Sequence, residues 1–536
     1  MSERTSFSVR RGDAAGSVLA IIAVGAVVRF LLAATVGLGV DESYAVAVAR
    51  DVSLSYFDHP PLHFWIAGTV ARLAHSEAPA VVRLPFVLCF AGTTWFIFSL
   101  GRRLFGDRAG LIAALLLNVS AVFSLSTGGW VLPDGPLMLL STAAADRIAA
   151  LLFGDEGGVS AGTPAGRSAA ARTYAPFAAW LWAGLFTGLA MLSKYHGGFV
   201  LAGTAAFLAT TPRFRKWLAT PGPYLGTLIA LVCFTPVIVW NARHHGVSFV
   251  FQSARATPTG FFSGGLHLDT FLANIGGQMA WVLPWIFVPL AASAWRALRA
   301  GPRDERRWFL LCIAAGPIAL FTLVSLRGDV GLPHWQAPGW LFVFPLLGAG
   351  VAERLDGVNA AVQRTARRWL KWSVGGYAAL ILVLATHAST GWMARVAPKL
   401  FERGDPTGDL VPWRMLKPTL AGLGYYPVNG FIAATSWIQA GKAAMAMGPG
   451  TPVLCLCADP HHFYYAESDS AFLGRDAMIV KKVREGDDVL ERFAPYFERI
   501  DPITRFGVYR GRQEVMQLEV YRAKNFRALY PTDQPR

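Results

Sequence analysis

Charged side chains are scarce in this sequence. Asp, Glu, Lys and Arg make up 15% of the 536 residues, whereas soluble domains carry about 25%. Hydrophobic residues reach 54%, and the mean hydropathy is +0.40. These values exclude an ordinary soluble protein and predict a chain that crosses the membrane several times.

Cysteines are few as well. The five present are too scattered for a disulfide framework, and three of them lie inside apolar segments. Cys455 and Cys457 form a single C-x-C pair, with no second pair to complete a zinc site. The sequence therefore predicts neither a disulfide-stapled fold nor a zinc module.

Acidic residues number 34 against 49 basic ones, which gives a net charge of +15. In a soluble chain this excess would point to nucleic acid, but here the cations sit in short loops between apolar segments. If the N-terminus is cytoplasmic and the spans alternate, these basic loops fall inside, and the outer loops carry far fewer cations. This is the positive-inside pattern. It predicts contact with membrane lipids and no nucleic-acid partner.

Internal repeats are not apparent, which argues against a solenoid and weakens a secondary-transporter interpretation. Long apolar runs, in contrast, are abundant. They predict a mainly α fold, a polytopic membrane helix bundle of about eleven spans. The predicted spans are 14–40, 79–100, 109–127, 131–152, 175–192, 196–210, 221–241, 270–295, 308–325, 335–352 and 370–390.

The composition changes to that of a soluble domain from about Gly391. Strand-like runs alternate there with helical patterns at 437–447 and 487–497. The strands are expected at 429–434, 452–457, 477–483, 508–509 and 514–522. We therefore predict a transmembrane domain over 1–390, with a first outer loop at 41–78, and a C-terminal soluble α/β domain over 391–536. A Gly/Ala/Ser-rich stretch at 154–173 is expected to be a flexible cytoplasmic linker.

Two carboxylates, Asp41 and Glu42, follow the first apolar run directly. Partial desolvation at a membrane boundary raises a carboxylate pKa toward values useful for a general base. A second interpretation makes Asp41 the N-cap of the helix that follows, with Tyr44 on its apolar face. The two interpretations are compatible.

Aromatic, acidic and histidine residues crowd the stretch from Tyr56 to Trp65, which reads as a turn entering a short interfacial helix. His59 and His63 are four residues apart and follow Asp58, a spacing that allows a metal site. Because prolines interrupt the helical face and no third ligand is near, we favour a polar lining or a phosphate contact and predict no metal.

Other polar residues collect on the same predicted outer face. Each has a structural alternative: a helix cap for Asp134, a snorkelling lysine for Lys194, a solvated loop for Arg243, or an interfacial anchor for His334. The alternative functional role of Lys194 and Arg243 is binding of an anionic substrate group. Asp134 would instead face the same cavity as Asp41, and His334 would line it. The residues concerned are Asp134, Lys194, Tyr195, Asn241, Arg243 and His334.

Several motifs resemble those of the bacterial branch of the dolichyl-phosphate-mannose protein mannosyltransferase family. That branch belongs to the GT-C superfamily and includes lipid A aminoarabinose transferase and rhizobial galacturonosyltransferases. The motifs are Asp41-Glu42, Tyr56-Phe57-Asp58-His59-Pro60-Pro61-Leu62, Gly188-Leu189-Ala190-Met191-Leu192-Ser193-Lys194-Tyr195, Pro236-Val237-Ile238-Val239-Trp240-Asn241, Gly277-Gln278, Asp405-Pro406-Thr407 and Ala440-Gly441-Lys442. The resemblance covers nearly the whole chain and is strongest over 41–65 and 184–241.

The resemblance implies an inverting glycosyltransferase of a bacterial inner membrane. It would move a sugar from a polyprenyl-phosphate carrier to a glycolipid or protein acceptor on the periplasmic face, without a cofactor. Asp41, Glu42 and Asp134 are the candidate catalytic residues. His59 stands where the aminoarabinose branch has a lysine, which argues against aminoarabinose as the sugar. The candidate donor-binding residues are Tyr44, Asp58, His59, His63, Lys194, Tyr195, Asn241, Arg243 and His334.

Two other functions remain open from the sequence. A transporter or flippase of lipid-linked sugars predicts repeat symmetry and carboxylates at the middle of the membrane. A non-catalytic envelope assembly protein predicts no special sensitivity at Asp41.

Overall fold

A computed structural model describes residues 11–154, 169–256, 265–402, 404–425, 430–466, 468–483 and 488–534. Most of the linker predicted at 154–173 lies outside these residues. The chain divides into two compact units. Unit 1 comprises Met1–Arg29, Phe86–Val239 and Val250–Ala379, and unit 2 comprises Phe30–Pro85, Trp240–Phe249 and Leu380–Arg536. The domain boundary predicted at residue 390 stays a prediction.

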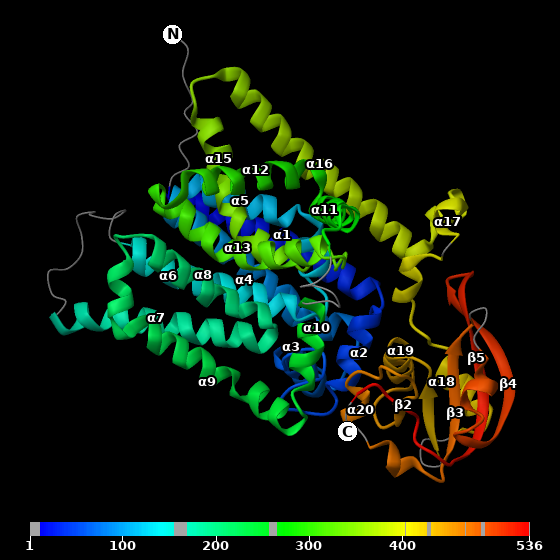
Figure 1. The fold of residues 1–536 in the computed structure, drawn as a ribbon. Helices are drawn as coiled ribbons and strands as arrows, with labels where there is room; N and C mark the ends of the chain where they lie inside the picture. Colours follow the sequence, from blue (N-terminus) through cyan, green and yellow to red (C-terminus); the bar gives the residue numbers. More distant parts are fainter. Residues whose placement is uncertain are drawn as a thin grey trace. The chain divides into compact units, whose positions relative to one another are not determined.

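Six described helices are long and apolar enough to cross a membrane (Figure 1). They are α1 (Arg11–Thr35), α4 (Pro79–Phe105), α6 (Asp134–Phe153), α9 (Pro221–Arg243), α13 (Glu305–Leu326) and α16 (Ala360–Thr390). Helices α11 (Leu268–Val282) and α12 (Pro284–Ala300) count as a seventh span if they are taken together across a 112° bend. These helices agree with the predicted polytopic membrane protein.

Every stretch predicted to span the membrane contains helix, but several helices are short. Helix α5 (Asp107–Asn118) has 12 residues, and α8 (Gly198–Thr210) has 13. At 1.5 Å per residue they are about 18–20 Å long, less than the ~30 Å hydrocarbon layer. The number eleven therefore stays a prediction. The remaining helices of this part are α7 (Ala169–Ser193), α10 (Val247–Ala256), α14 (Ala337–Trp340) and α15 (Phe344–Asp356).

Unit 2 contains a five-stranded sheet with the order β2-β1-β3-β5-β4. Strands β1 (Gly430–Ala434), β2 (Val453–Cys455) and β3 (Asp476–Lys482) run parallel, whereas β4 (Phe497–Arg510) and β5 (Gln513–Phe526) are antiparallel additions (Figure 1). Four of the five strands were predicted near these positions, whereas β4 is much longer than the two residues predicted at 508–509. The helix predicted over 437–447 is α19 (Trp437–Met447), whereas the one predicted over 487–497 is limited to α21 (Val489–Phe493), and residue 487 lies outside the described part.

The sheet separates two hydrophobic cores because side chains alternate along each strand. Phe431 and Ile479 belong to one core, which α21 completes with Phe493. Ile432 and Val480, one position further along the same strands, belong to the other core. Helices α18 (Leu416–Gly422) and α19 complete that second core with Leu416, Leu420, Ala443 and Met447.

Two short helices of unit 2 come from the first predicted outer loop. Helix α2 (Val40–Val48) follows α1, and α3 (Leu62–Leu73) begins after Pro61, as the Pro-Pro sequence indicated. Two further helical segments, α17 (Trp392–Val396) and α20 (Phe463–Ala466), lie in the C-terminal part.

Candidate functional site

The two carboxylates that follow α1 have opposite surroundings. Gly39 is the N-cap of α2, so Asp41 lies in the first helical turn and not at the cap position that the sequence indicated. The Asp41 side chain is exposed, whereas Glu42 is 1% exposed. Of this pair, Asp41 is the carboxylate that an incoming substrate can reach.

Glu42 is held in a buried ion pair. Arg83 Nε and Nη2 donate to its two carboxylate oxygens at 2.7 and 2.5 Å, and the Gly39 N–H donates to the same carboxylate at 2.9 Å. The rest of the Arg83 guanidinium donates to the backbone carbonyls of Ala33, Val36 and Gly37. The last carbonyls of a helix have no partner inside the helix, so Arg83 both caps α1 and pairs Glu42. This arrangement favours a positioning role for Glu42 over proton transfer.

A hydrogen bond between Tyr44 and Asp58 connects α2 to the segment that precedes α3. Tyr44 Oη donates to Asp58 Oδ1 at 2.7 Å and accepts from the His462 N–H at 3.1 Å. Burial, and then the neighbouring Asp58 carboxylate, raise the pKa of Tyr44 well above its ordinary value. Tyr44 is therefore a neutral donor that orients the Asp58 carboxylate.

His59 and His63 lie beside this pair. His59 Nε2 is 4.0 Å from Asp58 Oδ2, and the rings of His59 and His63 are 5.8 Å apart. Among the residues that the structure describes, no group of three His, Cys, Asp or Glu side chains is placed to hold a metal ion. Asp58, His59 and His63 thus lie near one another, and their role as a polar lining or a phosphate contact stays a prediction.

The segment 459–466 also belongs to this cluster, and sequence reasoning missed it. The His461 ring stacks on Trp437, and its Nδ1 lies 2.9 Å from Asp459 Oδ1. His462 accepts the Phe57 N–H at Nδ1, 3.2 Å away, and Tyr465 packs on Phe57. A usable signal was present, because His461-His462-Phe463-Tyr464-Tyr465 repeats the mixture of histidines and aromatics found at 56–65.

Acidification is expected to break the contact between His462 and Phe57. Burial, and then the neighbouring His244, lower the pKa of His462 from 6.5 to about 3. A group whose pKa is lowered on folding stabilises the fold above its ordinary pKa, so this contribution is lost as the pH falls from 6.5 toward about 3. Hydrogen exchange at the Phe57 amide, corrected for intrinsic rates, should accelerate over this range. His462→Gln should weaken the dependence. The Ser248 amide, bonded to the non-titrating Asn241 Oδ1, is the control, and equal behaviour of both amides would contradict the prediction.

Helix α19 packs directly on α2 within unit 2. A Cβ at Gly441 would lie 2.8 Å from Tyr44 N, so the two backbones touch and only glycine fits. The next residue, Lys442, donates to Leu38 O at 2.9 Å and to Asp409 O at 2.7 Å, and burial lowers its pKa to about 8. The Ala440-Gly441-Lys442 motif therefore fixes the chain just before Asp41.

Gly441→Ala is expected to destabilise unit 2 by roughly 1–3 kcal/mol, because the added methyl group forces α19 away from α2. Gly422→Ala is the matched control, since a Cβ at Gly422 meets nothing within 4 Å and alanine favours the helix. Thermal unfolding of the two variants should therefore shift in opposite directions. A shift of both in the same direction would disprove the close approach.

Unit 1 brings together a second set of predicted residues. Lys194 Nζ lies 3.0 and 3.1 Å from the two oxygens of Asp134, and the side chains are 8% and 4% exposed. Asp134 begins α6 after the N-cap Pro133, whose carbonyl accepts from Ser193 Oγ at 2.6 Å. Lys194 is therefore a buried, paired cation and not a snorkelling one.

Two histidines surround this pair in unit 1. Burial and then the charge of Lys194 lower the pKa of His334 to about 4, so this ring is neutral at pH 7. The His196 ring stacks on Phe321, with 5.0 Å between the ring centres. Tyr195 packs edge-on against Phe234, 6.0 Å between ring centres. The sequence predicted Tyr195 and His334, and the structure places both close to the Lys194–Asp134 pair.

A buried amide network of unit 1 was also missed from the sequence. The Asn274 amide donates to Val330 O, while its Oδ1 accepts from Gln278 and Gln336. Gln278 Oε1 in turn accepts from Trp340 Nε1. These bonds hold the segment that carries His334.

Asn241 and Arg243, at the end of α9, differ in exposure. Asn241 is 1% exposed and its Oδ1 accepts the Ser248 N–H, whereas Arg243 is exposed. Ser248 Oγ also donates to Tyr56 O at 3.0 Å, within unit 2. The Asn241 side chain thus fixes the loop that follows α9. Arg243 is exposed, so it is a more accessible cation than the buried Lys194.

Known proteins resemble this chain in sequence and in fold. A family model described as dolichyl-phosphate-mannose-protein mannosyltransferase matches residues 58–151 and 168–240. The lipid A galacturonosyltransferase RgtD of Rhizobium johnstonii is 25% identical over 353 residues, 65% of this chain and 66% of that protein. The match thus spans slightly less than two thirds of the relative. The crystal structure of ArnT from Cupriavidus metallidurans in the apo state is 15% identical, with a TM-score of 0.60, over 95% of this chain and 98% of that one. At this identity the structural match shows the fold alone.

Proposed function

We propose that this chain is a PMT-like glycosyltransferase of the GT-C superfamily, which it resembles over part of its length, and that it transfers a sugar from a polyprenyl-phosphate carrier to an envelope acceptor. The observation that supports this most directly is the environment of Asp41. It is an exposed carboxylate in the first turn of α2, which follows the candidate membrane helix α1, and it is the neighbour of Glu42 in the buried Glu42–Arg83 pair. A reactive group must be held rigidly to act in catalysis.

In the proposed reaction, Asp41 accepts the proton of the attacking acceptor hydroxyl, or orients that hydroxyl. The hydroxyl oxygen forms a bond to the anomeric carbon as the bond from that carbon to the phosphate oxygen breaks. Configuration is inverted, and polyprenyl phosphate leaves. Cationic side chains would stabilise the departing phosphate, and Lys194 and Arg243 are the candidates.

The placement we propose follows the charge of the loops. About eleven spans in a bacterial inner membrane, with the basic loops inside, put Asp41 and residues 391–536 on the periplasmic side. The relative from Rhizobium johnstonii acts on lipid A according to its name, so a lipid A-type glycolipid is the first acceptor to test. No metal or cofactor is required in this proposal.

The test is a transfer assay in proteoliposomes that contain the purified chain, a polyprenyl-phosphate sugar and a glycolipid acceptor. The proposal predicts a sugar-modified acceptor in the mass spectrum. Movement of the lipid-linked sugar across the bilayer without transfer would instead identify a flippase, and neither activity would indicate an assembly protein. Mass spectrometry of envelope glycolipids from a deletion strain would then identify the sugar and acceptor.

Lys194→Met is expected to lower transfer by about 10²–10³-fold if Lys194 stabilises the phosphate. Because this change also leaves the Asp134 carboxylate buried and unpaired, the double variant Asp134→Asn/Lys194→Met separates the two effects. It should recover thermal stability but not transfer, since it also lacks Asp134, itself a candidate catalytic residue. Recovery of transfer along with stability would assign both side chains a purely structural role.

A further inference from the structure

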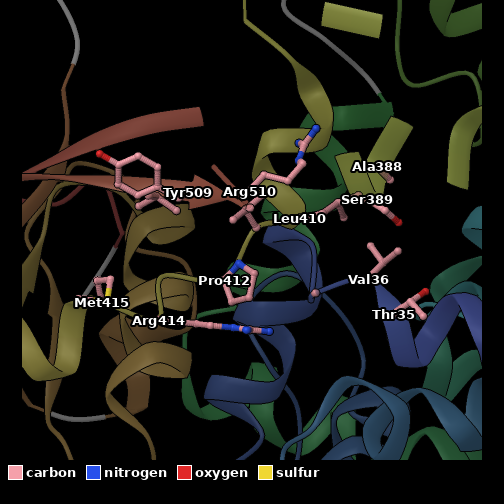
Figure 2. Close-up of a pocket in the computed structure, with 14 residues that line it drawn as sticks. Thr35, Val36, Ala388, Ser389, Leu410, Pro412, Arg414, Met415, Tyr509 and Arg510 are labelled. Atoms are coloured by element: carbon pink, nitrogen blue, oxygen red, sulfur yellow. The ribbon is translucent and has the colours of Figure 1, made fainter. Parts of the chain in front are cut away.

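A cavity of about 360 Å³ lies in unit 2, and Asp41 is not among its lining residues. Figure 2 shows its walls, which come from the ends of α1 and α16, the loop at 410–415 and the hairpin that joins β4 to β5. Its lining includes Thr35, Ser389, Pro412, Arg414, Met415 and Arg510.

The position of the cavity along the membrane normal follows from its walls. Thr35 is the last residue of α1, and Ser389 lies in the last turn of α16, and both helices are candidate spans. Two candidate spans therefore end at this cavity. The ends of spans lie at the level of the lipid headgroups.

The charged lining of the cavity is basic. Arg414 and Arg510 line it, and no acidic side chain does so among the described residues. Arg510 is 7% exposed and already committed, since it donates to Asp405, to Thr407 Oγ1 and to His387 O. It builds the wall and fixes the end of α16.

Arg414 is the accessible cation. Its side chain is exposed, and within the described ranges it makes no hydrogen bond or ion pair with the protein. Figure 2 shows it extended below Pro412 along the cavity. Thr35 and Ser389 add hydroxyl groups, while Pro412 and Met415 add an apolar side, and Met415 is 55% exposed. One free guanidinium beside an apolar wall suits a phosphate ester that is attached to an apolar chain.

We propose that this cavity binds the phosphate headgroup of an anionic membrane lipid, with Arg414 as the phosphate ligand. The proposal rests on the proposed function in one respect only, the orientation in the membrane, because that orientation decides which leaflet supplies the lipid. Gly37 lines the cavity, and its carbonyl accepts from Arg83 at 2.8 Å. A bound headgroup therefore also supports the chain segment that leads to Asp41.

The test is lipid retention by the full chain, measured by native mass spectrometry after extraction from nanodiscs of phosphatidylcholine with or without phosphatidylglycerol. Wild type should retain phosphatidylglycerol in preference to phosphatidylcholine. Arg414→Gln should weaken retention about tenfold, since it removes a charge-assisted hydrogen bond. Lys417→Gln, which removes a nearby charge outside the cavity lining, should leave retention unchanged.

Each other outcome would overturn the proposal. Equal retention of both lipids, or the same loss in both variants, would remove the site. Displacement of phosphatidylglycerol by inorganic phosphate alone would assign the cavity to the free ion rather than to a lipid. Since no sugar donor is present, failure here leaves the proposed transfer reaction intact, and an Asp41→Asn chain should retain lipid as wild type does.

Discussion

Asn in place of Asp41 is expected to reduce sugar transfer by about 10²–10⁴-fold, the range for loss of a general base. The reason is chemical rather than structural. Asp41 is exposed in the first turn of α2, and Asn keeps its size and hydrogen-bonding reach while losing the basic oxygen. The fold and binding of the donor should therefore be retained, and the loss should appear in kcat.

The measurement compares initial transfer rates of wild type, Asp41→Asn and Asp51→Asn in the same proteoliposomes. Asp51 is an exposed carboxylate of the same loop, so its replacement controls for a change of charge at the surface. Donor binding to each variant should be equal. Near-normal turnover by Asp41→Asn would falsify the catalytic role assigned to this residue.

Separation of Glu42 from Arg83 is expected to destabilise the protein by roughly 3–5 kcal/mol, as is usual when one partner of a buried ion pair is removed. Glu42→Gln leaves a guanidinium that is 2% exposed without its counter-charge. Arg83→Met is expected to be at least as harmful, because three backbone carbonyls at the end of α1 also lose their donor. Transfer should fall with stability, since Asp41 loses its support.

Thermal unfolding in detergent checks this prediction, with Arg499→Gln as the control. Arg499 pairs with Asp501 at the surface, with side chains 73% and 36% exposed, and such pairs contribute at most about 1 kcal/mol. The double variant Glu42→Met/Arg83→Met should recover part of the loss because no charge stays buried. Similar small shifts of the unfolding temperature for Glu42→Gln and Arg499→Gln would contradict the stabilising role of the buried Glu42–Arg83 pair.

The sequence correctly predicted helices and strands whose formation depends mainly on neighbouring residues. The alternation that predicts β5 and the helical spacing that predicts α19 depend on neighbours within one element, and both are found. The number of spans is harder to predict, because an apolar run buried inside a protein has the same composition as one facing lipid. Helix α5 illustrates this, since Leu116 and Leu117 are fully buried in the unit.

The candidate site could likewise be predicted only in part from the sequence. Sequence spacing indicated Asp41, Asp58 and His59 because they lie within one short loop. It did not indicate that Arg83 would neutralise Glu42, or that His462 would bond to the loop, because these contacts join residues far apart in the chain. Contacts between residues so far apart in the chain depend on the tertiary fold, which no local sequence pattern encodes.

The bond from Phe57 to His462 joins positions 405 residues apart, and this separation sets an order of events during translation. At roughly 5–20 residues per second, the ribosome needs about 20–80 s to make the chain between them. During that interval the loop with Asp41 is already synthesised but lacks the groups that hold Tyr44 and Phe57. A nascent or prematurely terminated chain therefore carries Asp41 without the contacts that hold Tyr44 and Phe57, and the proposed transfer activity is expected only after the segment around His462 has been made.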